Sequence, residues 1–333
     1  MKDLIKELTE TYGPSGNEEL IRNVIENKMK GLVDEMKTDT LGNLICIKKG
    51  QGAKVMLAAH MDEIGVVVNH IDKKGFLRFA AVGGVFPTYL LAHRVIFKNG
   101  IIGTFGKEEK GSTKGELKLE KMFIDIGAKD EKEASKYVHI GDVATYYREL
   151  DVLGSRFTAK AFDDRIGCAV LIETARKLKS SPNAVYFVFT VQEEVGLRGA
   201  KTSAYGIEPD IGIACDVTDT GDTPEAETMA VELGKGPCVK VKDRTIITPL
   251  KVKELMVSTA ESKKIPYQLE ILEWGGTDGG AIHLSRSGVP AGVISIPTRY
   301  VHTPSEVLDI GDVENAVRLF VEILKKNLKK EGF

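Results

Sequence analysis

The chain has 333 residues, 42% of them hydrophobic, so it is long enough to bury a full core and to form one large domain plus a smaller one. Its 46 basic and 48 acidic residues give a formal net charge of -2, which argues against nucleic acid as a partner. No apolar run approaches a membrane span, and the N-terminus is typical of a charged amphipathic helix without the apolar core of a signal peptide. Four isolated cysteines without CxxC spacing fit a reducing compartment. We therefore expect a cytoplasmic protein that binds no membrane.

The first part of the chain has an α/β pattern. Residues 2–32 have the periodicity of two helices, and Ser15 with Glu18 has the spacing of a capping box at the start of the second. Strands are predicted over 43–49 and 54–59, where short apolar runs are bounded by polar residues. These elements predict the beginning of an α/β domain.

The pattern changes over residues 66–152 to short alternating strands joined by tight turns. Lys98-Asn99-Gly100 is a predicted hairpin turn between strands at 94–97 and 101–105. Residues 103–120 are crowded with Gly, Lys and Glu, which favours a loop. We predict that this segment is a small β-barrel-like domain inserted into the α/β domain.

The α/β pattern resumes after the insert. It predicts a helix, a second helix, a strand and a final amphipathic helix over residues 165–179, 251–264, 267–272 and 312–329. Long apolar runs such as 185–191 are rich in β-branched residues and are typical of strands buried on both faces, as in parallel sheets. The predicted fold is therefore α/β, with a mixed, largely parallel sheet flanked by helices, formed by residues 1–65 and 153–333 together.

Four of the longest apolar runs end at residues of the types that bind metal ions. In chain order these residues are His60 with Asp62, Glu193 with Glu194, Asp216, and His302. In open α/β sheets, ligands bind beyond the carboxyl ends of the strands. Burying so many polar groups together would be costly unless something binds them. The pattern therefore predicts a site for a pair of divalent metal ions.

Each position also has an ordinary structural explanation. His60 and Asp62 form an H-x-D pair that fits a ligand and its orienting carboxylate, although a solvated histidine near an aspartate is more common. Asp163 and Asp164 open a helix, where capping and ligation are equally supported, and spacing does not separate the two. The two glutamates that follow strand 185–191 would be costly to bury without a cation. The conjunction of all the positions at one sheet edge is more specific than any one of them.

Five segments carry a resemblance to a known family. They are Ala59-His60-Met61-Asp62-Glu63-Ile64-Gly65, Lys160-Ala161-Phe162-Asp163-Asp164-Arg165-Ile166-Gly167, Gln192-Glu193-Glu194-Val195-Gly196, Ala214-Cys215-Asp216-Val217 and Arg299-Tyr300-Val301-His302-Thr303-Pro304-Ser305-Glu306. In this order they resemble the tetrahedral, or glutamyl-type, dinuclear metalloaminopeptidases, whose members are sometimes labelled glucanase M. The resemblance covers nearly the whole chain and implies a zinc-exopeptidase-like fold with a β-rich insert.

The resemblance implies a role for each position. Asp163 would bridge two metal ions, with one site completed by His60 and Asp216 and the other by Glu194 and His302. Glu193 would be the general base, and Asp62 would orient His60. The loop with Gly276, Thr277 and Asp278 would shape the substrate pocket. The insert of such proteins reaches toward a neighbouring subunit's active site, which gives His93 a candidate substrate role there.

The types of the predicted ligands and the aromatic content help to decide between the possible functions. Three carboxylates and two imidazoles suit zinc or cobalt, and manganese is also compatible. We expect an aminopeptidase that removes N-terminal residues from peptides. A glycoside hydrolase with paired carboxylates would leave His60 and His302 unexplained, and Trp274 is the single tryptophan available to stack on sugars. A non-catalytic, metal-stabilised binding module would have no use for an unligated Glu193.

The insert predicts self-association. Apolar stretches at 82–86 and 89–91 would be exposed on its hairpins, and exposed apolar surface commonly marks an interface. The resemblance implies dimers formed through the insert, and in many relatives six such dimers that close into a dodecamer. We expect a homo-oligomer with the dimer as its minimal unit.

Overall fold

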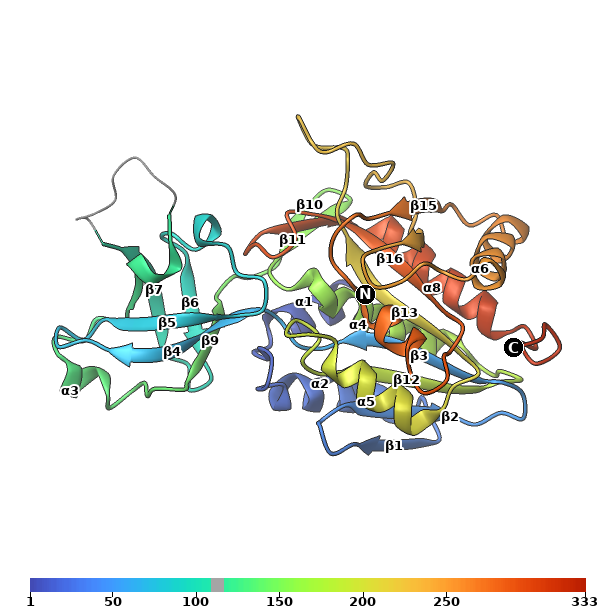
Figure 1. Cartoon of the computed structure of the whole chain (residues 1–333), viewed down its shortest axis with the longest axis horizontal. Helices are drawn as coiled ribbons and strands as arrows, with labels where there is room; N and C mark the ends of the chain where they lie inside the picture. Colours follow the sequence, from blue (N-terminus) through green and yellow to red (C-terminus); the bar gives the residue numbers. More distant parts are fainter. Residues whose placement is uncertain (109–116) are drawn as a thin grey trace.

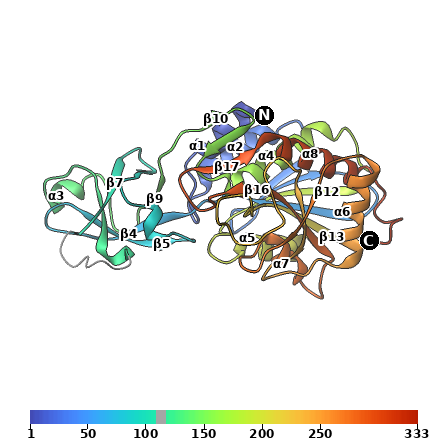
Figure 2. The same cartoon turned by 90° about the horizontal axis from the view of Figure 1, so that it is seen from above.

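The computed structural model describes residues 1–108 and 117–333 of the chain. It has an α/β body built on one large sheet and a closed β-barrel that projects to one side (Figure 1). Viewed from above, the barrel remains beside the body rather than over it (Figure 2). The α/β class and the barrel-like insert that the sequence predicts are both confirmed.

The large sheet has eleven strands, and its centre is parallel. Strands β12 (Ala184–Thr190), β3 (Lys54–His60), β13 (Ile211–Thr218) and β16 (Ala291–Arg299) are neighbours in this order and run parallel. The flanking strands are β1 (Glu35–Thr38), β2 (Leu44–Lys48), β10 (Asp151–Leu153), β11 (Arg156–Ala159), β14 (Cys238–Lys242), β15 (Gln268–Ile271) and β17 (Glu306–Asp309). Most of these pair antiparallel, so the sheet is mixed.

Helices cover both faces of the sheet because its central strands are apolar on both sides. In β3, Val55 and Leu57 belong to one core, whereas Met56 and Ala58 belong to another, as the alternation of a strand requires. The first core is covered by α1 (Lys2–Glu10), α2 (Glu19–Met29), α4 (Phe162–Lys177), α6 (Leu250–Ser262) and α8 (Ile310–Leu324). The second is covered by α5 (Arg198–Ile207) and α7 (Asp278–His283).

The barrel closes through six antiparallel strands and has a core of its own. In barrel order these are β4 (Gly65–Ile71), β5 (Leu77–Val82), β8 (Met122–Asp125), β7 (Ile102–Lys107), β6 (Arg94–Phe97) and β9 (Val143–Tyr146). One short α-helix, α3 (Glu131–Ala134), and the 3₁₀ turns Pro87–Tyr89 and Leu119–Lys121 lie between them. Phe79, Phe97 and Phe105 fill the interior, which is separate from the two cores of the sheet.

Two local predictions near the insert and the N-terminus were wrong. Strand β7 runs through residues 102–107, in agreement with the strand predicted at 101–105 but overlapping the loop predicted over 103–120, because it pairs with both β6 and β8; residues 109–116 lie outside the described part. Ser15 and Glu18 form no capping box, since Glu18 is itself the N-cap residue of α2 and no side chain caps that helix.

The last helix ends earlier than predicted, at Leu324 rather than near residue 329. The Asn183 side-chain amide donates to the carbonyl groups of Leu324 and Lys326, and its oxygen accepts from the backbone of Leu328. The chain therefore turns, and Leu328 is buried in the core.

The structure also bears on the cysteines and on membrane-spanning helices. All four cysteines are buried free thiols, as their scattered apolar surroundings predict. Within residues 1–108 and 117–333 we find no helix with the length and apolar character needed to cross a membrane.

Candidate active site

The predicted ligands meet at the carboxyl edge of the parallel strands. His60 is the last residue of β3, and Glu193 follows the end of β12. Asp216 lies near the end of β13, and His302 follows β16. Because these four strands are adjacent and parallel, their ends bring residues far apart in the chain to one place.

The distances between these side chains are those of a compact cluster. His60 Nε2 lies 2.9 Å from Asp163 Oδ1, and His302 Nε2 lies 3.1 Å from Asp163 Oδ2. His302 Nε2 is also 3.3 Å from Glu194 Oε2. One carboxylate therefore faces two imidazoles, one through each of its oxygens, which is the arrangement expected of a residue shared between two cations.

Asp163 and Asp164 point to different surroundings, which their spacing in the sequence could not reveal. The two residues have non-helical backbone angles at the start of α4, and the peptide bond between them is cis. The Asp164 carboxylate accepts from the backbone N–H groups of His60 and Gly167 at 3.2 and 3.0 Å, and it is fully buried. Asp164 therefore supports the backbone of His60, whereas Asp163 faces both imidazoles.

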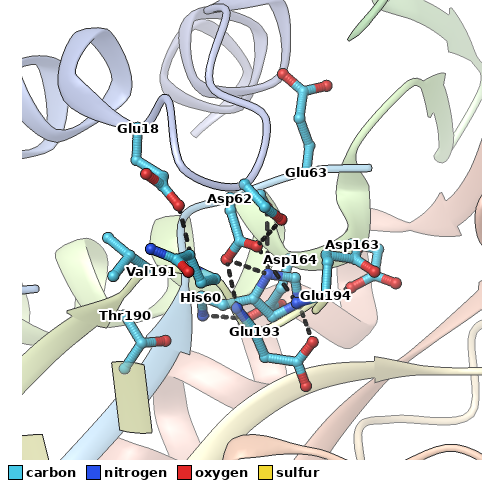
Figure 3. A network of polar contacts seen from close by, with 12 residues as sticks. Glu18, His60, Asp62, Glu63, Asp163, Asp164, Thr190, Val191, Glu193 and Glu194 are labelled. Carbon is cyan, nitrogen blue, oxygen red and sulfur yellow. Dashed lines mark hydrogen bonds and ion pairs between the residues drawn. The ribbon is translucent and has the colours of Figure 1, made fainter. Parts of the chain in front are cut away.

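Asp62 contacts more than the imidazole that it was predicted to orient. Its Oδ1 lies 3.5 Å from His60 Nδ1, and the same oxygen accepts from the backbone N–H of Glu193 at 3.0 Å. Its Oδ2 accepts from the backbone of Glu194 at 3.3 Å and from the Ser15 hydroxyl at 2.5 Å. Figure 3 shows this carboxylate between the end of β3 and the loop that carries the two glutamates. A single buried side chain thus relates a histidine to both glutamates.

The cluster buries several carboxylates close together, and this shifts their pKa values. Burial raises the pKa of Glu193 well above its usual range, and the charge of Asp216 adds to the shift. Burial also raises the pKa of Asp216. In contrast, hydrogen bonds from His302 and His60 outweigh burial at Asp163 and hold its pKa below the usual range. The surplus of negative charge indicates that a cation belongs here.

The donor atoms fit divalent metal ions. Ligand atoms of His60, Asp163 and Glu194 lie within 4.8 Å of one another, and so do those of His60, Glu193 and Asp216. Glu194 Oε1 is buried without a hydrogen-bond partner, so this oxygen is available to a cation. Imidazole nitrogens and carboxylate oxygens are ligands that zinc, cobalt and manganese accept.

A cavity of about 660 Å³ opens directly onto the cluster. His60, Asp163, Glu193, Glu194, Asp216 and His302 all line it. Its other walls include Arg244, Trp274 and the predicted substrate-binding residues Gly276 and Thr277. The cavity is large enough for a small organic group or a peptide end beside the cluster.

The segment that follows the barrel strand β5 also forms part of this wall. Gly84 and Phe86, on the segment that follows β5, line the cavity. A Cβ at Gly83 would lie 3.2 Å from Cβ of Glu194. The backbone of the insert therefore approaches the glutamate-bearing loop closely.

Two predicted substrate-binding residues lie elsewhere. Asp278 is buried, and its Oδ2 accepts from the Thr190 hydroxyl at 2.5 Å, behind the cavity wall. His93 is exposed on the barrel and does not line the cavity of its own chain. Of the other histidines, His70 and His139 are exposed, and His283 Nδ1 lies 3.0 Å from the Val289 carbonyl.

Sequence reasoning missed Glu306, which is buried beneath the cluster. Its Oε1 accepts from the backbone of His302 at 2.9 Å, and its Oε2 accepts from the backbone of Asp163 at 3.2 Å. The signal was present in the run from Arg299 to Glu306, where the glutamate stands four residues after the histidine.

Glu63 was also missed, and it joins the barrel to the α/β body. Its carboxylate pairs with Lys160 at 2.5 Å and with Arg165 at 3.3 Å, and it accepts from the Thr145 hydroxyl of β9 at 2.7 Å. All four side chains are buried. An acidic residue next to Asp62 is visible in the sequence, but its partners Lys160, Arg165 and Thr145 are too distant in the chain to be assigned to it by pattern.

Comparison with known proteins points to one family. Residues 42–319 match the family model for M42 glutamyl aminopeptidase. A putative aminopeptidase of Acetivibrio thermocellus is 55% identical, over 97% of this chain and 98% of its own length. The TET aminopeptidase of a marine-sediment Thaumarchaeota archaeon superposes with a TM-score of 0.96 at 37% identity, covering 99% and 98% of the two chains. The Pyrococcus horikoshii TET1 peptidase, described as assembling into a tetrahedron or a large octahedral shell, gives 0.88 at 32%, covering 98% and 99%.

The fold, the site and these similarities define a peptide hydrolase of the aminopeptidase class. The chain belongs to the M42 glutamyl aminopeptidase family. The resemblance seen in the sequence is thereby confirmed.

Proposed function

We propose that this enzyme removes N-terminal residues from peptides with the help of two divalent metal ions, and that Glu193 is its general base. The ions would be held by His60, Asp216, Glu194 and His302, with Asp163 shared between them. The observation that carries the proposal is the position of Asp163, whose two oxygens lie 2.9 and 3.1 Å from two different imidazoles.

Glu193 suits the work of a base because it lies beside the ligands and faces the cavity. Its Oε2 is 3.9 Å from His60 Nε2, farther than the 2.9 Å that separates His60 from Asp163. In this position it would accept a proton from the attacking water and deliver it to the leaving amine. Because ligand atoms of Glu193, His60 and Asp216 lie within 4.8 Å of one another, the metal content of a Glu193 variant distinguishes a base from a ligand at this position.

The metal pair would act as a Lewis acid. When bound, two divalent cations would supply Lewis-acid activation of the peptide carbonyl and of a water molecule. Zinc and cobalt suit the ligand set best, and manganese is compatible. The Asp62 carboxylate would fix the His60 imidazole and the backbone of Glu193 relative to each other.

A glycoside hydrolase is the second candidate, since Trp274 and Phe86 line the cavity and offer aromatic surface. That mechanism uses an acid and a base on two carboxylates and gives no work to His60 or His302. The two candidates differ in the need for metal, so a chelator separates them.

The test measures release of N-terminal residues from short peptides and compares two adjacent glutamates. A chelator should abolish activity, and zinc or cobalt should restore it. Glu193→Gln should lower kcat about 10²–10⁴-fold while elemental analysis still finds two metal ions per chain. Glu194→Gln should lose metal as well as activity. Near wild-type activity of Glu193→Gln would contradict the base assignment, and chelator-resistant cleavage of a β-glucan would favour the glycosidase.

The barrel supplies a second part of the proposal. We propose that residues 66–152 are the dimerisation domain, with 1–65 and 153–333 as the catalytic domain, and that peptides are the substrates of a closed homo-oligomer. Phe86, Tyr89 and Leu91 are 52%, 44% and 38% exposed on the barrel, an unusual concentration of apolar surface. In such an assembly, the insert of one subunit would bring its His93 to the active site of a neighbouring subunit.

A further inference from the structure

Side chains hold the backbone N–H groups of the loop that carries Glu193 and Glu194, whereas its carbonyl groups at residues 191–193 accept from the backbone of residues 196–199. Four successive backbone N–H groups, of residues 191 to 194, donate to carboxylate or amide oxygens. The acceptors are Asn43 at 3.0 Å for Val191, Glu18 at 3.1 Å for Gln192, and Asp62 at 3.0 and 3.3 Å for Glu193 and Glu194. Among residues 1–108 and 117–333, the strand pairing of β12 ends at Thr190, so beyond it these side chains supply the acceptors that a neighbouring strand would otherwise provide.

The backbone of this loop has a conformation that needs support. Gln192 has a φ of 53°, the left-handed region that residues other than glycine rarely adopt. The same residue is the only one of the four whose N–H is held by Glu18. Such a conformation persists when the surroundings determine it more strongly than the residue's own preference does.

Glu18 is well suited to impose it. Its side chain is buried at the N-terminus of α2, and its Oε1 accepts from the backbone of Gly16 at 2.7 Å as well as from Gln192. The first bond fixes the carboxylate to its own turn, and the second joins that turn to a loop 174 residues away. Figure 3 shows Glu18 at the upper left, with its carboxylate apart from those of Glu193 and Glu194.

We propose that Glu18 is a positioning residue for the reaction, acting through the backbone of Gln192 on the side chains of Glu193 and Glu194. This inference rests on the function proposed above for those two glutamates. Glu18 contacts neither of their carboxylates and does not line the cavity. Its effect is therefore on geometry: without it, residue 192 relaxes and the base moves from its position beside the cluster.

The test uses two substitutions of similar size. Glu18→Gln keeps an acceptor oxygen and should keep kcat within about threefold, whereas Glu18→Met has no acceptor and should lose about 10- to 100-fold, with KM changed by less than about threefold. Glu19→Gln is the matched control, since this neighbouring carboxylate is exposed and pairs with Lys98 on the surface at 3.2 Å. It should behave as the wild type.

A measurement independent of activity accompanies the kinetics. In the metal-free full-length protein, amide hydrogen exchange over residues 191–194 should be faster in Glu18→Met than in the wild type and Glu18→Gln. Exchange in helix α8 should be the same in all three. If Glu18→Met does not fold, Glu18→Asp, which keeps the charge but falls short of Gln192, should give the same loss of kcat and the same faster exchange.

Several results would overturn the inference. They are an unchanged kcat in Glu18→Met, a change confined to KM, equal impairment in Glu18→Gln and Glu18→Met, or unchanged exchange over residues 191–194. These results are distinct from a failure of the proposed function, which Glu193→Gln tests alone. Exchange in the metal-free protein reports on the support of the loop whether or not Glu193 is the base.

Discussion

Gly84 of the insert lies so close to His302 that a Cβ on the glycine would fall 2.5 Å from the imidazole Nδ1 and 2.6 Å from Cε1. Side-chain atoms never approach Cβ this closely without displacement of one partner. The backbone of the barrel segment is therefore in contact with a predicted metal ligand. This contact makes the insert part of the active site of its own chain as well as a candidate interface.

Substitution of this glycine should damage the site without unfolding the protein. In Gly84→Ala the new methyl group should displace the His302 imidazole, which lowers the affinity for the second metal ion and reduces kcat about tenfold or more. Gly206→Ala is the control, because a Cβ at this helical position meets nothing within 4 Å. Metal titration followed by peptide cleavage measures both effects. Equal behaviour of the two variants would show that the loop at residue 84 adapts freely.

The two aspartates at the start of α4 should separate metal binding from stability. Asp163→Ala should lose metal stoichiometry as well as activity, because its oxygens face His60 and His302. Asp164→Ala should retain more metal per chain than Asp163→Ala. It should unfold at a lower temperature than the wild type, because the N–H groups of His60 and Gly167 are left without an acceptor. Elemental analysis and thermal unfolding distinguish the two. Full two-metal stoichiometry in Asp163→Ala would point to Asp164 as the bridge.

The metal-free protein should lose stability as the pH rises. Burial raises the pKa of Asp278 from 3.8 to about 6 and raises those of Glu193 and Asp216 as well. These groups bind protons more tightly when folded, so their contribution is present at low pH and is lost as the pH rises through the folded pKa. After metal removal, the midpoint temperature of unfolding should therefore decrease as the pH is raised from about 5 to about 7.5.

A variant and added metal provide the controls for this pH dependence. Asp278→Asn should show a smaller fall, because one titrating group is gone while an oxygen remains for the Thr190 hydroxyl. Added zinc should restore the midpoint most strongly at the higher pH, where the carboxylates are ionised. A midpoint of the metal-free wild type that rises over the same range would contradict the assignment of surplus buried charge.

The sequence was sufficient to predict the residues of the cluster because strand ends carry a strong signal. All the predicted ligands except Asp163 follow an apolar run, and parallel strands necessarily align their carboxyl ends, so His60 and Asp216 could be placed together from the sequence. Spacing could not distinguish Asp163 from Asp164, because adjacent residues differ only in the local direction of the backbone.

Contacts between distant backbone and side-chain groups were beyond prediction. Ser15 has the spacing of a helix cap, yet its hydroxyl donates to Asp62, because the fold brings the two together. Glu306 holds the backbones of His302 and Asp163; its spacing of four residues from His302 hints at the first contact, whereas nothing in its local sequence indicates the contact with Asp163, 143 residues away. The approach of Gly84 to the site depends on how the barrel sits beside the sheet, which hydrophobic periodicity does not encode.

Assembly through the barrel is the last prediction. Tyr89 and Leu91 are exposed on the insert, so burial against a second copy would remove apolar surface from water. Light scattering across a dilution series, with metal present, should find a dimer or a larger closed form rather than a single 36.4 kDa chain. Leu91→Glu should shift the protein toward smaller species, because the charge would have to be buried in the interface. Leu284→Glu, at a 75% exposed position on the α/β body, is the control and should leave the mass unchanged. A monomeric wild type at micromolar concentration would defeat the prediction, and an equal response to both substitutions would remove the barrel from the interface.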